Sequence, residues 1–223
     1  SMPDAQARTP GAQAPRMPSL REIGSLMINR RFMTVTGLAA IPAKMLLTGL
    51  CFYLVPLYLL SIGSTQAMAG RVLMIYGVVM VLVMPLGASL AHSRVRMEWL
   101  VGAGLLLSGL GGTMLILGEG VLWVFAAVGF VGLGQSLSIA AQSALVREHC
   151  DAEVATMGEP AVYGVYRLLE RLGNACGPLL AGVLVLMFGY RTSFVATGAL
   201  AFLCGVGFLL ATRRPPTPVP LPA

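Results

Sequence analysis

The sequence predicts an all-α, polytopic membrane protein whose six transmembrane helices pack into one bundle. Hydrophobic residues make up 57% of its 223 residues and charged residues only 11%, and the mean hydropathy is +0.81. A soluble domain of this size needs far more charge on its surface. The apolar residues gather in six stretches, each at least as long as the ~20 residues that cross the ~30 Å hydrocarbon core of a bilayer. The predicted spans are residues 32–60, 68–91, 98–117, 121–146, 163–188 and 193–212.

Composition argues against several other classes of protein. The apolar runs are continuous rather than alternating with period two, which disfavours a membrane β-barrel, and the 27 glycines suit close helix packing. A net charge of +6 would suggest a nucleic-acid partner in a soluble protein. Here the positive charges flank the spans, so no nucleic acid is expected. The four cysteines lack C-x-x-C spacing, and neither a disulfide framework nor a metal site is expected.

The two ends of the chain differ in composition from the spans. Residues 1–18 are rich in proline, alanine and glutamine and predict a disordered linker, whose opening Ser-Met is typical of an expression remnant. Residues 19–31 open with an S-x-x-E capping box and predict a cytoplasmic juxtamembrane helix. Residues 32–212 form the six-span domain, and the proline-rich residues 213–223 predict a disordered cytoplasmic tail.

Arginine placement predicts the orientation of the spans. One side carries ten arginines, whereas the other side carries only Arg71 and Arg191. The ten are Arg21, Arg30, Arg31, Arg94, Arg96, Arg147, Arg167, Arg171, Arg213 and Arg214. By the positive-inside rule these ten face the cytoplasm, so both termini are expected there. A bacterial inner membrane is the expected location.

Lys44 is the most informative single residue. It lies ~12 residues into the first span, which at 1.5 Å per residue places it ~18 Å deep, near the midplane. A lysine at the centre of a membrane helix costs on the order of 2.5–3.5 kcal/mol or more. Lys44 is therefore expected to face a water-filled cavity, an acidic partner or an anionic ligand, with Thr48 on the same face of its helix. Two interpretations remain open: a structural ion pair, or a direct role with substrate or protons.

Spans two and four carry the next candidates. In span four, Gln135, Ser138 and Gln142 recur at helical spacing and form one polar stripe. This stripe either lines a cavity or only hydrogen-bonds neighbouring helices. Span two is apolar except for Tyr76, which shares one side of its helix with methionines.

Span five opens with charges on one side of its helix. Arg167, Glu170, Arg171 and Asn174 recur at three- and four-residue spacing. Because these residues lie near the cytoplasmic end, the charged members either form a gate of ion pairs or are interfacial charges solvated by headgroups.

The same span continues with small residues. Gly173 and Gly177, with Gly182 further along, are expected to let a neighbouring helix approach closely. Pro178 is expected to kink the helix, because it lacks a backbone donor. No catalytic motif accompanies these features: G-x-S-x-G, a Walker A loop, H-E-x-x-H and paired intramembrane aspartates are missing. Neither an enzyme nor a cofactor is expected.

Three segments resemble signatures of the major facilitator superfamily of transporters. Residues 173–182, GNACGPLLAG, resemble the family motif G-x-x-x-G-P-x-x-G-G. Residues 188–194 resemble the short external turn that follows that helix, and residues 85–96 resemble a degenerate form of the cytoplasmic loop G-x-L-x-D-R-x-G-R-R. The resemblance covers about residues 19–214, and the order of the motifs among six spans makes it strong.

The resemblance implies a fold and a set of candidate residues. The family has twelve spans in two halves, each built from two inverted three-helix repeats. This chain resembles the C-terminal half, spans seven to twelve, because its cytoplasmic loop has His92, or Ala91 in a shifted register, where N-terminal halves usually keep an aspartate. The implied substrate-pathway residues are Lys44, Thr48, Tyr76, Gln135, Ser138, Gln142 and Asn174. The implied cytoplasmic gate comprises Arg167, Glu170, Arg171, Gly87, His92, Arg94 and Arg96.

The expected function follows from this resemblance. The chain is expected to be the C-terminal half of a secondary active transporter that moves a small solute by alternating access. The expected partners are the lipid bilayer, a solute for which an anionic group is one option, and either an N-terminal six-helix half or a second copy. The alternative is a six-span sensor or scaffold domain that does not transport and is joined to other modules.

Overall fold

The computed structural model describes residues 19–91 and 96–213, and all regular structure in these residues is helical. The predicted linker, most of the predicted tail, and the candidate residues His92 and Arg94 lie outside these ranges. The helices are α1 (Leu20–Ile28), α2 (Arg30–Val35), η1 (Thr36–Ala40), α3 (Ile41–Leu46), η2 (Leu47–Leu54), α4 (Val55–Ser61), α5 (Gln66–Ala91), α6 (Met97–Thr113), η3 (Met114–Ile116), α7 (Val121–His149), α8 (Asp151–Met157) and α9 (Glu159–Thr212).

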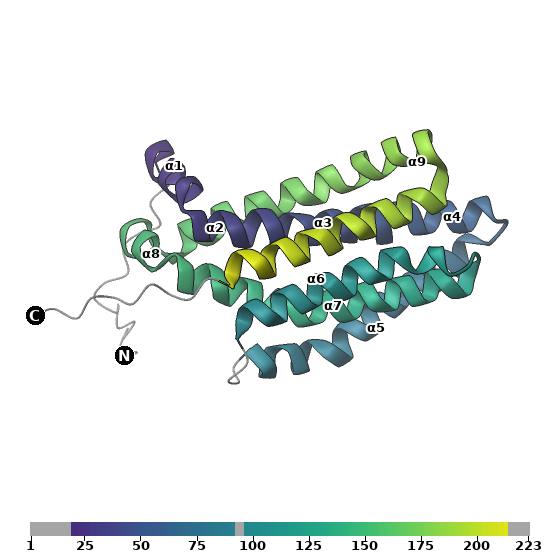
Figure 1. Cartoon of the computed structure of the whole chain (residues 1–223), viewed down its shortest axis with the longest axis horizontal. Helices are drawn as coiled ribbons and strands as arrows, with labels where there is room; N and C mark the ends of the chain where they lie inside the picture. The colour runs from purple at the N-terminus through teal and green to yellow at the C-terminus, as the bar shows by residue number, and fades with distance from the viewer. Residues whose placement is uncertain (1–18, 92–95, 214–223) are drawn as a thin grey trace, which may run out of the picture.

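Five stretches of helix in the described residues are long and apolar enough to cross a membrane: Arg30–Ser61, Gln66–Leu90, Met97–Ile116, Val121–His149 and Glu159–Thr212. The last of these, α9, is two antiparallel arms, because the chain reverses at Gly189 (Figure 1). Gly189 has φ 76° and ψ 173°, a left-handed backbone that glycine adopts without strain. The described residues therefore make six passes, and the all-α membrane bundle predicted from the sequence is confirmed.

The turn at Gly189 is fastened to the neighbouring helices by one arginine. Arg191 donates from Nε to the carbonyl of Leu115 and from Nη2 to that of Ile116, both at 3.1 Å. Its Nη1 lies 3.5 Å from Glu119. Arg191 thereby satisfies carbonyls at the end of η3 that have no partner within their own helix. The turn of α9 lies at one end of the bundle, and α1 and α8 lie at the other (Figure 1).

The first span runs from Arg30 to Ser61 as one continuous helix with two π-helical segments. The segment η1 directly precedes the turn that holds Pro42, and η2 directly precedes the turn that holds Pro56. A proline ring has no N–H to donate and crowds the carbonyl four residues earlier, so the helix there accommodates a wider i→i+5 pattern. The short α3 between the two segments carries Lys44, close to the middle of the span.

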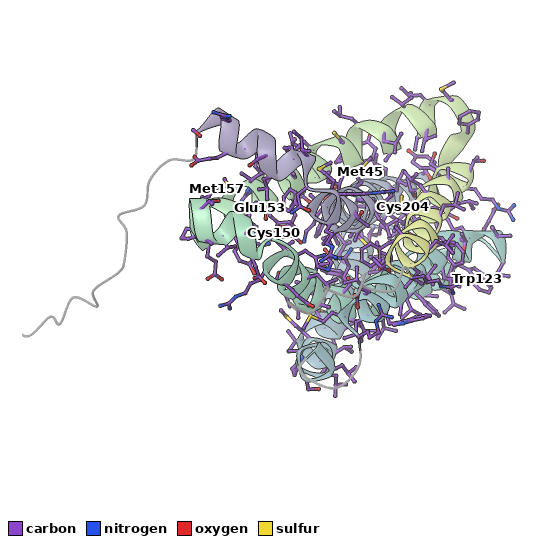
Figure 2. The ribbon with its side chains drawn as sticks, turned by 60° about the vertical axis from the view of Figure 1, so that its left-hand side comes forward. Met45, Trp123, Cys150, Glu153, Met157 and Cys204 are labelled. Carbon is purple, nitrogen blue, oxygen red and sulfur yellow. The ribbon has the colours of Figure 1, made fainter. Side chains whose placement is uncertain are left out.

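A capping box and an asparagine organise the α1 end. Ser19 and Glu22 cap α1 reciprocally, as the sequence predicts, with the Ser19 backbone N–H donating to Glu22 Oε2 at 2.6 Å. The helix ends at Asn29, whose side chain then caps α2 by accepting from the backbone N–H groups of Arg31 and Phe32. Asn29 Nδ2 also donates to Glu153 Oε1 on α8 at 2.7 Å. Figure 2 shows Glu153 and Cys150 at this end of the bundle.

Glycines set the distances between the spans. A Cβ on Gly104 of α6 would lie 2.5 Å from the Gly134 carbonyl of α7, and a Cβ on Gly112 would lie 2.8 Å from the backbone nitrogen of Gly198 in the second arm of α9. These helices therefore touch along their backbones, which only small residues permit. The helix α5 also touches α7 in this way, at Gly87, but it is the least covered span: its most apolar stretch is 11% buried, against 56% for those of the first span, α6 and α7.

Candidate functional site

Lys44 has an acidic partner in the structure. Its Nζ lies 3.5 Å from Oε1 of Glu170, and only 16% of the Lys44 side chain and 6% of the Glu170 side chain are exposed. The other carboxylate oxygen of Glu170 accepts from Arg167 Nη1 at 2.7 Å. One buried carboxylate thus lies between two cations. We call Lys44, Glu170 and Arg167 the charge triad.

The triad forms because two helices meet closely at this level. A Cβ on Gly173 would lie 2.8 Å from the Ile41 carbonyl and 3.3 Å from the Cβ of Lys44, so the first arm of α9 rests directly on α3. Glu170 lies three residues before Gly173 and therefore projects from the same side of α9. This contact brings the carboxylate to the lysine.

The two cations of the triad attract Glu170 unequally. At 3.5 Å and an effective dielectric constant near 20, two unit charges attract by about 4–5 kcal/mol, which offsets the cost of keeping a lysine inside the bilayer. Arg167 is 60% exposed, so water screens most of its attraction for the carboxylate. Lys44 is therefore the main counter-ion of Glu170, and the triad as a whole carries one net positive charge.

The charges meet in a different combination from the cluster of Arg167, Glu170 and Arg171 that sequence spacing suggested. Lys44 pairs with Glu170, whereas Arg171 is exposed and has no ion pair in residues 19–91 and 96–213. Of the environments expected for Lys44, the acidic partner is the one observed. Neither its identity nor its helix followed from the sequence.

The polar stripe of α7 is buried between helices. Gln135, Ser138 and Gln142 are each exposed by 2% or less. Gln135 Nε2 donates to the Ala43 carbonyl at 2.9 Å, beside Lys44 in the chain, whereas its Oε1 has no hydrogen-bond partner among the described residues. Ser138 packs against Gly104, whose Cβ position is 2.7 Å from that of Ser138. The glutamines thus do bridge helices, and they leave polar atoms unmatched.

Tyr166 joins this buried layer although the sequence analysis did not single it out. Its hydroxyl donates to Gln142 Oε1 at 3.4 Å and lies beside the Glu170 carboxylate, and 1% of the residue is exposed. Gln142 Nε2 has no partner among the described residues. Tyr166 precedes Glu170 by four residues, so the helical period was the signal that could have identified it.

Three other pathway candidates are less engaged. Thr48 donates to the Lys44 carbonyl at 2.9 Å, within its own helix. Tyr76 is half-buried and packs edge-on against Phe52, with ring centroids 6.4 Å apart. Asn174 is half-buried, and the described part of the chain offers its side chain no hydrogen bond. Of these three, Thr48 is the one that hydrogen-bonds to a residue of the triad.

The remaining gate candidates lie apart from the triad. A Cβ on Gly87 would overlap the Ser136 carbonyl, so this glycine lets α5 rest on α7. Arg96 is exposed and lies 3.6 Å from Glu98, at the start of α6. Gly87 therefore lies at a helix crossing, and Arg96 forms a local ion pair, rather than either residue contacting the triad.

The packing candidates line the first arm of α9. A Cβ on Gly177 would lie 2.5 Å from the Met45 carbonyl, and one on Gly182 would lie 3.1 Å from the hydroxyl of Tyr53. Pro178 lies inside α9. Among the described residues of this helix, only Gly189, further along the chain, has non-helical backbone angles. The arm is therefore held along much of its length against the first span.

Comparison with known families supports the same architecture. The family model described as Major Facilitator Superfamily matches residues 98–223, more than half of the chain, and the match includes the glycine motif that resembles the family. No curated protein matches the chain. The bundle of antiparallel apolar helices fits this family, whose members are transporter-type membrane proteins. The chain belongs to the Major Facilitator Superfamily.

Proposed function

We propose that this chain is the C-terminal half of a secondary active transporter that moves a small solute across a bacterial inner membrane by alternating access. Both of its termini then lie in the cytoplasm, on the side of α1 and α8. The family supports a transporter. The arginine distribution supports the orientation.

The buried pair of Lys44 and Glu170 is the observation that carries the proposal. Lys44 lies close to the middle of a 32-residue span, and both side chains are largely shielded. A buried ion pair adds little net stability compared with apolar residues of the same shape. Ionisable groups at this depth in a membrane protein are functional candidates for that reason. A scaffold that only had to hold six helices together would gain little from them.

The solute pathway runs along the polar side of α9. Glu170, Arg167 and Asn174 recur at three- and four-residue spacing, so they share one side of the first arm. The other side of the arm is apolar and exposed, with Leu179 71% and Leu186 88% accessible. The polar side packs against the first span at Glu170 and faces the central cavity between the two halves at Arg167 and Asn174, whereas the apolar side faces lipid.

An N-terminal six-helix half completes the transporter. In the isolated chain α5 leaves large apolar side chains uncovered, among them Met74 at 63% and Val81 at 75%. Its only extensive helical neighbour among the described elements is α7. The N-terminal half covers part of this surface. A second copy of the chain would cover it instead if the gene encoded no such half, and light scattering of the purified protein separates the two cases.

Thiol labelling tests alternating access without knowledge of the solute. Asn174→Cys is made in a background in which Cys176 and Cys204 are replaced by serine, while the buried Cys51 and Cys150 remain. A membrane-impermeant methanethiosulfonate is applied to the intact gene product in right-side-out and in inverted membrane vesicles. The cysteine should react in both preparations, because a pathway residue is open to each side in turn.

Leu179→Cys in the same background is the matched control, because Leu179 lies on the apolar side of the same arm. It should resist the impermeant reagent in both preparations. Labelling of Asn174→Cys in one preparation only would favour the non-transporting sensor or scaffold. Protection in both preparations would remove Asn174 from the pathway and contradict the assignment of the polar side.

A further inference from the structure

We propose that α1 and the start of α2 form a docking surface for anionic phospholipids. The lipid phosphates contact Arg21, Arg30 and Arg31, while Ile28 enters the apolar edge of the same leaflet. The partner is a negatively charged lipid surface. The proposal goes beyond the transport function and does not depend on it, because it follows from where α1 lies relative to the spans.

The helix α1 departs from the direction of the spans at Asn29. This residue lies between α1 and α2 with an extended backbone, φ −61° and ψ 108°, and the first span begins at the next residue. Figure 1 shows α1 at a steep angle to the long helices, at the end of the bundle where the first span begins. A short helix in this position lies near the level of the lipid headgroups.

The two sides of α1 have different surroundings. Leu26 is fully buried in the core of the bundle, and Ile23 packs against the same core. On the outward side, Arg21, Ser25 and Ile28 recur at spacings of four and three residues, and all three are exposed. Ile28 is 84% exposed, so an apolar side chain is left uncovered beside basic ones. This combination is typical of helices that bind membrane surfaces.

The guanidinium groups of this segment are available to a ligand. Arg21, Arg30 and Arg31 are exposed, and in the part of the chain that the structure describes their side chains form no ion pair or hydrogen bond. The one acidic residue of the segment, Glu22, is engaged with Ser19 in the capping box. A guanidinium carries five N–H donors in a planar arrangement that matches a phosphate.

The charge of the neighbouring α8 indicates which part of this end meets lipid. Residues 19–31 carry three arginines and one glutamate, a net charge of +2, whereas residues 147–159 carry one arginine and four acidic residues, a net charge of −3. The two segments are joined where Asn29 Nδ2 donates to Glu153 Oε1 at 2.7 Å. Anionic headgroups attract the first segment and repel the second. We therefore expect α1 to face lipid and α8 to face water.

The expected strength of the contact follows from the number of arginines. One arginine close to an anionic membrane surface strengthens binding by about fivefold, so three together strengthen it by roughly a hundredfold. The attraction falls off within a Debye length, which is about 8 Å at physiological salt and about 3 Å at about 1 M salt. High salt should therefore release α1 from an anionic surface without any substitution.

A fluorescent probe on the outward side of α1 measures the contact. Ser25→Cys is made in the intact gene product with Cys176 and Cys204 replaced by serine, and is labelled with a nitrobenzoxadiazole dye. The protein is placed in nanodiscs of phosphatidylcholine with a rising fraction of phosphatidylglycerol. The emission should move to shorter wavelengths and become quenched by nitroxide-labelled lipid as that fraction rises. The same dye at Ala155→Cys, an exposed position on α8, should keep the spectrum of a dye in water.

Variants in the Ser25→Cys background separate the contributions. The ratio of lipid-bound to water-exposed dye should fall about fivefold in Arg21→Gln and roughly a hundredfold when Arg21, Arg30 and Arg31 are all replaced by glutamine. Arg71→Gln is the matched control, because it removes the same charge from an exposed position near the start of α5. It should leave the ratio unchanged.

Several outcomes would overturn the proposal. Identical spectra in neutral and anionic nanodiscs would show that α1 does not recognise lipid charge. An unchanged ratio in the triple variant, or at about 1 M salt, would show that the arginines do not hold α1 on the surface. An equal response of the dye at Ala155→Cys would show that the contact is not specific to α1. Two-sided labelling of Asn174→Cys tests transport separately, so failure of either proposal leaves the other standing.

Discussion

The close contact between α9 and the first span makes a quantitative prediction about one methyl group. A Cβ on Gly177 would lie 2.5 Å from the Met45 carbonyl and 3.0 Å from the backbone nitrogen of Gly49. Both neighbours are backbone atoms, which have no rotamer with which to move aside. In Gly177→Ala the two helices must separate by about 0.9 Å to reach ordinary van der Waals contact.

The size of the effect follows from a matched substitution on the same helix. Gly164 has no atom within 4 Å of its Cβ position, so Gly164→Ala only gains helix propensity, worth up to about 1 kcal/mol. Gly177→Ala gains the same propensity but adds an overpacking cost of about 1–3 kcal/mol. The difference between the two variants is therefore about 1–3 kcal/mol, or roughly 2–12 °C in Tm for a domain of this size.

A thiol-reactive fluorescent dye measures that difference. Cys51 and Cys150 are fully buried and become available only when the bundle opens, which gives the unfolding signal during a thermal ramp. The exposed Cys176 and the partly buried Cys204 are replaced by serine in both variants to remove background. Equal Tm values for Gly177→Ala and Gly164→Ala would refute the close crossing. Because that crossing brings Glu170 close to Lys44, the same result would also refute the geometry of the charge triad.

Two further predictions concern single side chains. Lys44 is the only lysine in the sequence, so amidination of its ε-amine can be followed by mass spectrometry. Glu170→Gln should accelerate this reaction, because the carboxylate no longer holds the amine in an ion pair; an unchanged rate would contradict the pairing. Burial raises the pKa of the Cys150 thiol to about 12, so in the folded protein Cys150 should resist iodoacetamide at pH 8 and react only as the pH approaches that value. Rapid alkylation of folded protein at pH 8 would show that Cys150 is not buried.

The spans could be predicted because hydrophobicity alone specifies them. Each predicted apolar stretch is helical to within one residue, and some of the helices run further. The helix α7 continues past the predicted end at residue 146 to His149, and the first arm of α9 begins at Glu159 rather than at residue 163. These extra turns carry polar residues, and a hydropathy criterion ends a span where the polar residues begin.

The partner of Lys44 could not be predicted from the sequence. The cost of an isolated buried lysine indicates that some wet or negative group must be near. Which group it is depends on how two helices far apart in the sequence are rotated against each other. That rotation is set by Gly173 against Ile41 and Lys44, a contact that only the three-dimensional structure supplies. Spacing along α9 grouped Glu170 with Arg167 and Arg171, and in the described residues Arg167 pairs with Glu170, whereas Arg171 is exposed.

Irregularities of the backbone were also beyond the sequence analysis. Pro42 and Pro56 indicate bends in the first span. They do not show that a π-helical segment precedes each proline, or that one of these segments lies before Lys44 and the other after it. The sequence also could not show that amide atoms of Gln135 and Gln142 lack hydrogen-bond partners among the described residues. Their polar stripe fitted a cavity lining as well as hydrogen bonds between helices. Both features concentrate near the charge triad, where departures from regular packing are expected if the region is functional.

A double-mutant cycle on the pair tests the central claim most directly. Unfolding free energies are measured in detergent for the wild type, Lys44→Gln, Glu170→Gln and the double variant. Glu170→Gln leaves Lys44 without its counter-ion, and Lys44→Gln leaves Glu170 with Arg167 alone. The double variant should therefore be more stable than the sum of the single losses predicts, by a coupling energy of about 0.5–3 kcal/mol. Losses that add within about 0.3 kcal/mol would show that Lys44 and Glu170 do not interact, and would contradict the account.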